Sequence, residues 1–334
     1  MSTRAIPLAT LSALSPGQEA DFFALMTVKD ELSTREGKPY FRVGFRDARR
    51  EVQFPVWGDS PWADECRLRW WPGVFYKIRA LYRETSYGPQ LDIHKIRPAT
   101  EEDAGDGFDP LMLRPRSARD PAEMYEELVW LIGESIGDVA LQKLVLDVLE
   151  TYRDELLVWT AARRNHHAYV GGFLEHALSV TRTCVYLAEK YDESYPDVTP
   201  RLNKDVVVAG GALHDIGKLR ELSQEPTAAA YTPQGYLIGH VLLGRDMVRE
   251  AAARHSVDRE TLLRLEHVLV SHERPEGAAV KQPMTPEALL VQYADDLDAK
   301  YHMLVTILRG DTNPGPVTTS KNILNREIFR GVSQ

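Results

Sequence analysis

Histidines and acidic residues recur inside apolar, helix-forming segments in the second half of this 334-residue chain. Imidazoles and carboxylates that converge inside a helical bundle are costly to bury unless something compensates them. A divalent metal ion is the simplest compensation, and such a site points to hydrolytic chemistry. The candidate metal ligands are His176, His214, Asp215, His240, His272 and Asp295.

Length and composition fit a globular protein of two domains, with 43% hydrophobic and 27% charged residues. The first residues show no secretory signal, and no apolar stretch is long enough to span a membrane. The two cysteines, Cys66 and Cys184, lie far apart in the sequence and do not predict a structural disulfide. We therefore expect a cytoplasmic protein.

Five short segments rich in aromatic and β-branched residues lie between residues 20 and 98 and predict an antiparallel sheet. Alternation is clear where Phe41, Val43 and Phe45 point to one face. A short helical candidate at 59–68 separates the third strand from the fourth. Five strands with a helix in that place are the order of an OB-fold barrel, which we expect over residues 1–98.

An acidic and proline-containing stretch at 99–120 predicts a linker, and everything after it has helical periodicity. Pro121 suits the first turn of a helix, with Asp120 as its cap. The predicted fold class is therefore multidomain, a small all-β barrel followed by an all-α bundle over 121–334. The expected helices lie at 121–135, 138–159, 172–191, 203–222, 236–254, 258–271 and 285–308.

Charge is distributed unevenly along the chain. Residues 1–98 hold 15 Lys and Arg against 12 Asp and Glu, whereas the remainder holds 25 against 37. A mildly basic first domain, followed by an acidic remainder, is compatible with weak binding of a polyanion by the first domain. Chance variation explains the same numbers, so charge alone does not predict a nucleic-acid partner.

Helical position supports three of the ligand candidates. His176 lies on the apolar side of its helix. His214 and Asp215 end an apolar run whose two glycines permit close packing, and a charged residue there is hard to explain by packing. A buried His–Asp hydrogen bond is the alternative. Lys218 shares their face and either binds a phosphate beside the metal or pairs with Asp215.

The other candidates stand at helix ends and on the last long helix. His240 follows a glycine at a helix start. His267 and His272 do not share a helical face, and we choose His272, which lies at the helix end, as the ligand. Asp295 is the candidate carboxylate ligand. Asp298, three residues later, would orient a histidine or a metal-bound water.

These residues resemble the HD superfamily of metal-dependent phosphohydrolases, whose signature is H…HD…D. NHHAYVGGFLEHALSV, LNKDVVVAGGALHDIGKLREL, YTPQGYLIGHVLLG and PMTPEALLVQYADDLDAK further look like the YhaM-type 3′→5′ exoribonucleases. That resemblance implies an OB-fold domain followed by an HD domain. The residues that match the signature are His176, His214, Asp215 and Asp295, and His240 and His272 match members that hold two metals.

One position departs from the family pattern. Glu273 follows His272 where relatives commonly have a second histidine. Glu273 either ligates a metal as a carboxylate or leaves the second site weak or absent, so we expect one or two ions. The resemblance also implies a substrate-binding role for His167, and the alternative is a loop histidine that caps the next helix.

Histidine and carboxylate ligands without thiolate suit Mn²⁺ or Co²⁺, which we favour, and also Fe²⁺, Ni²⁺ or Zn²⁺. Such an ion activates water near neutral pH, and Lys218 would offset charge on the phosphate. In the barrel, Trp57 and Tyr82 either stack on bases or pack against the helical domain. The full set of candidate strand contacts in the barrel is Tyr40, Arg42, Trp57, Tyr82 and Arg83.

The leading hypothesis is a metal-dependent 3′→5′ exonuclease that degrades single-stranded RNA, or DNA, to nucleoside 5′-monophosphates. A second hypothesis is a phosphohydrolase of free nucleotides or cyclic dinucleotides with a regulatory barrel. A third is a nucleic-acid-binding protein whose metal site is inactive. The expected partner is a single strand and not a membrane, and assembly into a homo-oligomer is left open.

Overall fold

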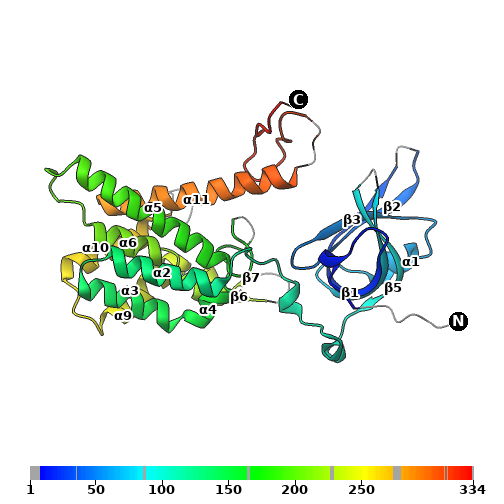
Figure 1. Cartoon of the computed structure of the whole chain (residues 1–334), viewed down its shortest axis with the longest axis horizontal. Helices are drawn as coiled ribbons and strands as arrows, with labels where there is room; N and C mark the ends of the chain where they lie inside the picture. Colours follow the sequence, from blue (N-terminus) through cyan, green and yellow to red (C-terminus); the bar gives the residue numbers. More distant parts are fainter. Residues whose placement is uncertain are drawn as a thin grey trace. The chain divides into compact units, whose positions relative to one another are not determined.

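The computed structural model describes residues 8–34, 36–85, 88–163, 166–225, 229–273, 280–311, 313 and 315–332. The chain forms two compact units, which meet in sequence between Arg116 and Ser117. Each unit has its own apolar core. An antiparallel sheet makes up the first and helices dominate the second (Figure 1). The predicted fold class is confirmed.

The first unit is a five-stranded antiparallel barrel. Its strands follow one another in space as β3-β2-β1-β4-β5, and β3 also lies against β5. Helix α1 (Ala63–Arg69) connects β3 to β4. This order is that of an OB-fold, as predicted. The strands are β1 (Glu19–Ser33), β2 (Pro39–Arg46), β3 (Glu51–Trp57), β4 (Phe75–Thr85) and β5 (Gly88–Pro98).

Strand β1 holds the barrel together because it pairs with two neighbours along its length. Its first half pairs with β4 and its second half with β2, and the register shifts between Met26 and Val28. Such a bulge bends and twists a strand, which helps a sheet to curl into a barrel. Phe41, Val43 and Phe45 of β2 point into the core, which confirms the predicted alternation.

The stretch expected to be a linker is partly folded. It contains two short 3₁₀ helices, η2 (Glu101–Asp106) and η3 (Pro110–Leu113). The Asp103 carboxylate accepts hydrogen bonds from Arg97 at 2.6 and 2.7 Å, and Phe108 packs on aromatic rings of β1 and β4. These contacts attach residues up to about 113 to the barrel.

The second unit is a helical bundle with one small hairpin, β6 (Leu222–Gln224) and β7 (Ala229–Tyr231). The hairpin and α8 (Pro233–Leu237) were not predicted. The expected helix 138–159 breaks at Tyr152, and the expected helix 203–222 ends at Leu213 and resumes after a turn. The remaining helices are α2 (Pro121–Ser135), α3 (Val139–Thr151), α4 (Arg153–Val158), α5 (Gly172–Ser194), α6 (Lys204–Leu213), α7 (Lys218–Glu221), α9 (His240–Ala252), α10 (Arg259–Ser271) and α11 (Pro286–Gly310).

Helix α6 is the central helix of this bundle, and it is buried from Val206 to its end. Two glycines let its neighbours approach closely. A Cβ atom on Gly210 would lie 2.6 Å from a methyl carbon of Val268 in α10, and one on Gly211 would lie 2.9 Å from the sulfur of Cys184 in α5. The predicted close packing is therefore present, and it fixes where the chain leaves α6.

Other local predictions agree with the structure. The Asp120 side chain accepts a hydrogen bond from the backbone N–H of Ala122 and caps α2, whose first residue is Pro121. Cys66 and Cys184 are both free and buried. Among the described residues, no helix combines the length and apolar character needed to cross a bilayer.

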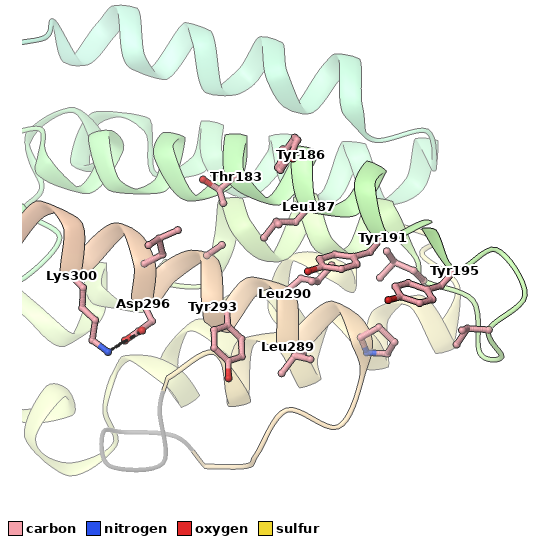
Figure 2. A pocket seen from close by; sticks show the side chains of 15 residues that line it. Thr183, Tyr186, Leu187, Tyr191, Tyr195, Leu289, Leu290, Tyr293, Asp296 and Lys300 are labelled. Atoms are coloured by element: carbon pink, nitrogen blue, oxygen red, sulfur yellow. Dashed lines mark hydrogen bonds and ion pairs between the residues drawn. The ribbon is translucent and has the colours of Figure 1, made fainter. Parts of the chain in front are cut away.

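An apolar groove of about 920 Å³ runs between α5 and α11. Tyrosine and leucine side chains of both helices line it, and an ion pair between Asp296 and Lys300 lies at one end (Figure 2). Tyr293 and Leu297 are more than half exposed there. The groove contains none of the predicted metal ligands, so the chemistry of this unit lies elsewhere.

Candidate metal centre

The six predicted ligands come together from five helices although they are distant in sequence. All except Asp295 are buried. Two compact groups result, and within each group the ligand atoms lie within 4.8 Å of one another. The residues are His176 in α5, His214 and Asp215 directly after α6, His240 at the start of α9, His272 directly after α10, and Asp295 in α11.

The first group contains His176, His214 and Asp295. The Nε2 atom of His176 lies 3.2 Å from Oδ1 of Asp295 and 3.2 Å from Nε2 of His214. Two ring nitrogens and a carboxylate oxygen thus face one small space. Nitrogen and oxygen donors that converge in this way suit a divalent ion.

The second group contains Asp215, His240 and His272. The Nε2 atoms of both rings lie 3.6 Å from the same oxygen, Oδ1 of Asp215. Glu273 adds a further carboxylate, because its Oε1 lies 3.5 Å from Nε2 of His240. The departure from the family pattern therefore places an acidic oxygen beside this group.

Asp215 connects the two groups through its two oxygens. Oδ1 faces the second group, whereas Oδ2 lies 3.5 Å from Nε2 of His176 and 3.5 Å from Nε2 of His214. One carboxylate therefore serves two adjacent positions. This arrangement suits a pair of neighbouring ions, for which a shared carboxylate balances the charge of both.

Each of the four histidines is anchored through its other nitrogen. Nδ1 of His176 lies 2.7 Å from Asp298, and Nδ1 of His240 lies 3.0 Å from Glu221. Nδ1 of His214 and of His272 lie 3.0 and 2.9 Å from backbone carbonyls one helical turn earlier. Such acceptors fix the tautomer and turn Nε2 inward, as in histidines that bind metals.

The unpaired atoms of the site also fit a cation. Within the described residues, Nε2 of His240 and Nε2 of His272 are buried without a hydrogen-bond partner. A buried polar atom left unpaired costs free energy, which a bound ion recovers. The residues present, imidazoles and carboxylates without thiolate, therefore fit a divalent first-row metal.

Lys218 makes the predicted contact with Asp215. Its Nζ lies 2.5 Å from Oδ2 of Asp215, and both side chains are buried. Burial opposes the ionisation of Asp215, but Lys218 and His214 outweigh it and hold the pKa of this carboxyl well below its usual value. Asp215 is therefore ionised at neutral pH.

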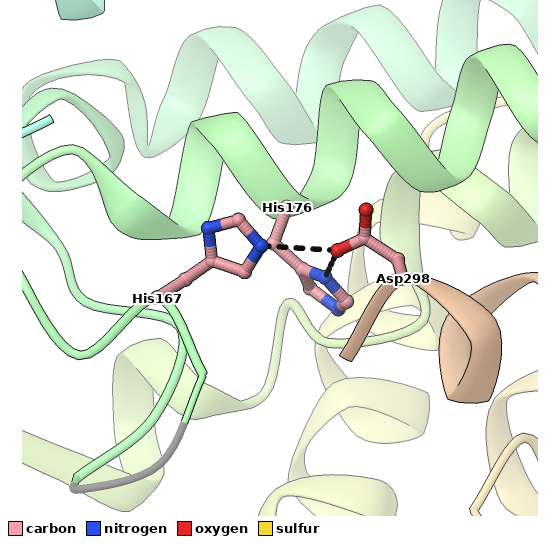
Figure 3. Close-up of side chains that lie close together, drawn as sticks. All are labelled: His167, His176 and Asp298. Carbon is pink, nitrogen blue, oxygen red and sulfur yellow. Dashed lines mark hydrogen bonds and ion pairs between the residues drawn. The ribbon is translucent and has the colours of Figure 1, made fainter. Parts of the chain in front are cut away.

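Asp298 supports the site without belonging to either group. Its carboxylate accepts hydrogen bonds from His176, from the Ser179 hydroxyl at 2.5 Å, and from His167, whose Nε2 lies 3.1 Å away (Figure 3). Burial opposes its ionisation, but the bonds from His167 and His176 outweigh it and lower its pKa. The geometry agrees with the prediction that Asp298 orients a histidine, and it places His167 beside the site.

Two of the predicted strand contacts form one aromatic surface on the barrel. Tyr40 in β2 and Trp57 in β3 are cross-strand neighbours whose ring centroids lie 5.2 Å apart. Trp57 is 47% exposed. It lines a cavity of about 260 Å³ between β3 and β5, together with Arg83. The two rings are therefore available to a planar ligand.

The other residues predicted to contact a strand differ in how far they are exposed to a ligand. Arg42 pairs with Asp30 at 2.5 Å and Arg83 with Asp92 at 3.1 Å, and all four side chains are about half exposed. Tyr82 was assigned wrongly as a stacking residue. It is 3% exposed and belongs to the barrel core, because its strand turns this ring inward.

The sequence did not reveal the anchoring residues. Glu221 was overlooked because 203–222 was predicted as one helix, in which residue 221 has no reason to approach His240. A turn at 214–217 breaks that helix and brings the Glu221 carboxylate to both the backbone N–H and Nδ1 of His240. Its largely polar surroundings, KLRELSQ, gave no signal, and neither did those of Ser179 and Tyr169.

Residues 173–300 match the sequence model of the HD domain family. Residues 173–300 form an HD domain. Both groups of ligand atoms lie inside this segment. HD domains bind divalent metals, and an HD domain implies a metal-dependent phosphohydrolase.

Solved structures similar to this chain show low overall similarity. The second OB-fold domain of replication protein A from Methanococcus maripaludis is 15% identical, covers 28% of this chain and 96% of its own, and has a TM-score of 0.22. A crystal structure of a domain of the same protein is 12% identical, with coverages of 27% and 93% and a TM-score of 0.21. Asparaginyl-tRNA synthetase from Entamoeba histolytica, in complex with asparaginyl-adenylate, is 11% identical, with coverages of 47% and 37% and a TM-score of 0.21. The OB-fold assignment rests on the strand order instead.

Divalent ions should stabilise the HD domain through Asp215. We expect Mn²⁺ at about 100 times its Kd to raise the free energy of unfolding by about 2.7 kcal/mol. Asp215→Asn should abolish this gain, because the amide removes the negative charge that both groups share. Calorimetric titration and thermal unfolding of protein stripped with a chelator measure the effect.

Asp296→Asn is the matched control, because this carboxylate of α11 pairs with Lys300 and lies in neither group. It should respond to Mn²⁺ as the unmodified protein does. An equal response from the Asp215→Asn variant would contradict the assignment.

The stability of the metal-free HD domain should depend on pH through His240. Burial opposes protonation of His240, but the hydrogen bond with Glu221 and the nearby Glu273 carboxylate outweigh it and raise its pKa to about 9 from 6.5. A raised pKa stabilises the fold fully below pH 6.5, and this contribution is lost as the pH rises through 9. We expect a loss on the order of 3 kcal/mol between these values.

Urea unfolding in the presence of a chelator, at several pH values from 6 to 9.5, measures this loss. In the His240→Gln variant, the free energy of unfolding should depend less on pH in that range. A profile that keeps its slope in the variant would show that another group titrates.

Proposed function

We propose that this protein is a metal-dependent 3′→5′ exonuclease of the YhaM type. It hydrolyses single-stranded RNA, and also single-stranded DNA, to nucleoside 5′-monophosphates. One observation carries the proposal: four imidazoles, each anchored through Nδ1, turn Nε2 toward the two oxygens of Asp215. Phosphodiester hydrolysis is a typical use of such a paired site.

The ligand groups suggest how two ions would be held. The first group would hold one ion and the second group, with Glu273, the other, while Asp215 serves both. A divalent ion, with Mn²⁺ or Co²⁺ favoured, supplies Lewis acidity and makes water reactive near neutral pH.

The surrounding side chains would bind and orient the strand. The Lys218 ammonium, held beside Asp215, would lie next to a phosphate that approaches the site and offset its negative charge. Asp298 keeps the His176 ring in place through its Nδ1. His167, which is hydrogen-bonded to Asp298 through Nε2, would lie beside the bound phosphate.

The barrel would hold the strand by its bases. Tyr40 and Trp57 offer neighbouring rings, of which Trp57 lines a cavity, and Arg42 and Arg83 carry charges for the phosphates. Stacking contributes about 1–3 kcal/mol per base and is largely independent of base sequence, which suits the degradation of strands of differing sequence. The two free, buried cysteines fit action in a reducing cytoplasm.

Strands labelled at either end test the activity. With Mn²⁺ or Co²⁺, a 5′-labelled single strand should shorten stepwise, and a 3′-labelled strand should release labelled mononucleotide at once. His214→Ala should abolish both signals, because it removes a ring from the first group. Gel analysis of time courses gives the polarity.

Internal cuts, or no cleavage with any divalent ion, would refute the exonuclease. Turnover confined to free nucleotides or cyclic dinucleotides would favour the second hypothesis. Strand binding without turnover would favour the third.

The contribution of the barrel to substrate binding can be separated from that of the metal site by comparing long and short substrates. Trp57→Ala should raise KM for a long single strand by about 5- to 150-fold, which corresponds to the loss of one stacked base. The same variant should leave KM for a dinucleotide unchanged. Steady-state kinetics on both substrates measure the difference.

Trp130→Ala is the control, because Trp130 is a comparably exposed tryptophan on α2 of the helical unit. It should leave both substrates unaffected. An unchanged KM for the long strand in the Trp57→Ala variant would remove this surface from the binding site.

A further inference from the structure

Two arginines of the barrel unit are buried without a partner. Arg114, which follows η3, is 5% exposed, and Arg46 at the end of β2 is partly buried. The Nε atom of Arg46 is buried without a hydrogen bond, and among the described residues neither guanidinium group forms a side-chain hydrogen bond or an ion pair. A guanidinium group keeps its charge at physiological pH, so this burial leaves positive charge uncompensated.

The strand register places Arg46 on the outer face of the barrel. Arg46 is the cross-strand neighbour of Leu25 in β1, and Leu25 is that of Phe75 in β4. Directly opposed residues of antiparallel strands point to the same face. Phe108, between η2 and η3, packs on Phe75 from outside, and η3 contacts β1. Arg114 ends this covering segment and therefore approaches Arg46 on the same face.

The two guanidinium groups repel each other. Burial lowers the pKa of Arg114, and the charge of Arg46 lowers it further. Burial also lowers the pKa of Arg46, although the Glu51 carboxylate acts in the opposite direction. An anion that approaches both groups would relieve their repulsion and compensate their burial.

The carboxylates next to Arg46 are bound to other groups. Asp47 accepts hydrogen bonds from three backbone N–H groups at 2.7, 2.8 and 2.9 Å. Glu51 accepts from the Thr27 hydroxyl at 2.6 Å and from the Gln53 amide at 3.1 Å. Within the part of the chain that the structure describes, neither carboxylate forms an ion pair with either arginine. Both positive charges are therefore left for a ligand.

The side chains and their position favour a phosphate group as that ligand. The guanidinium fork matches the oxygens of a phosphate and binds two of them at once. Alternate residues of a strand share a face, so Arg46 lies on the same face of β2 as Tyr40 and Arg42. Tyr40 and Arg46 are six residues apart, which is about 20 Å along a strand. The arginine pair therefore continues the surface that Tyr40 begins.

We propose that Arg46 and Arg114 form a phosphate-binding site on the outer face of the barrel. The phosphate is a phosphodiester of a single strand or a free phosphate, because both present the same oxygens. The site acts in binding, so it does not depend on whether the metal centre cleaves a strand.

Arg114→Met tests the site, because it keeps an unbranched side chain and removes the charge. It is made in the full-length protein that carries His214→Ala, which should prevent turnover. We expect the affinity for a long single strand to fall about 10-fold. The slope of log affinity against log salt concentration should become shallower by about 0.7, the value for one phosphate contact of a single strand. Fluorescence anisotropy of a labelled strand measures both.

Arg69→Met is the matched control, because it removes one charge from an exposed arginine at the end of α1. It should leave the salt dependence unchanged. Arg46→Gln is the second test variant, and it should lower the strand affinity as Arg114→Met does. Its side chain is only partly buried, so this variant has less effect on folding.

Inorganic phosphate distinguishes the two sources. If the site takes free phosphate, adding this ion should raise the unfolding temperature by several degrees with Arg114 present and not in Arg114→Met. Since the metal centre is the same in both proteins, the difference reports the barrel site alone. A change in strand affinity without this response assigns the site to the strand.

The stability of Arg114→Met provides a further check. Without phosphate, this variant should unfold at the same temperature or higher, because it removes an unpaired buried charge. A marked loss of stability would assign Arg114 to the packing of the barrel and overturn the proposal. Strand affinity and phosphate response that both variants leave unchanged would also overturn it. A strand that is bound through the pair and never cleaved would refute the exonuclease and leave this site standing.

Discussion

One buried carboxylate organises the helical unit. Asp215 lies where five helices deliver side chains, and its two oxygens divide those side chains into two groups. The convergence of these side chains depends on α6, whose glycines bring α5 and α10 close enough for their histidines to meet. Without these small residues, the neighbouring helices would be displaced and the imidazoles would not face a common space.

A buried network of ordinary hydrogen bonds does not explain this cluster. Two Nε2 atoms, of His176 and His214, lie 3.2 Å apart, and within the described residues those of His240 and His272 have no partner. Polar atoms in a protein core are normally paired. The cost of leaving them unpaired is understandable if the site binds a cation, which the HD domain match supports.

The metal ligands could be predicted from the sequence, whereas the groups that hydrogen-bond and anchor them could not. The reason is physical. Polar residues such as His176 and His214 stand out because apolar neighbours surround them in the sequence. Two of the anchors are backbone carbonyls, which every residue has, and Glu221 reaches His240 only because a turn breaks the expected helix. In the barrel, strand order followed from the apolar pattern, but Tyr82 was misplaced because its own strand alternates with the ring inward, beneath the Arg50 guanidinium.

The wide sequence separation of the ligands has a consequence for biosynthesis. The ribosome adds about 5–20 residues per second, so on the order of ten seconds pass between His176 and Asp295. During that interval the number of ligand imidazoles in the nascent chain rises from one to four, while the metal site is still incomplete. The first group cannot close before α11 has emerged, so translation itself sets the earliest moment at which the completed pocket exists.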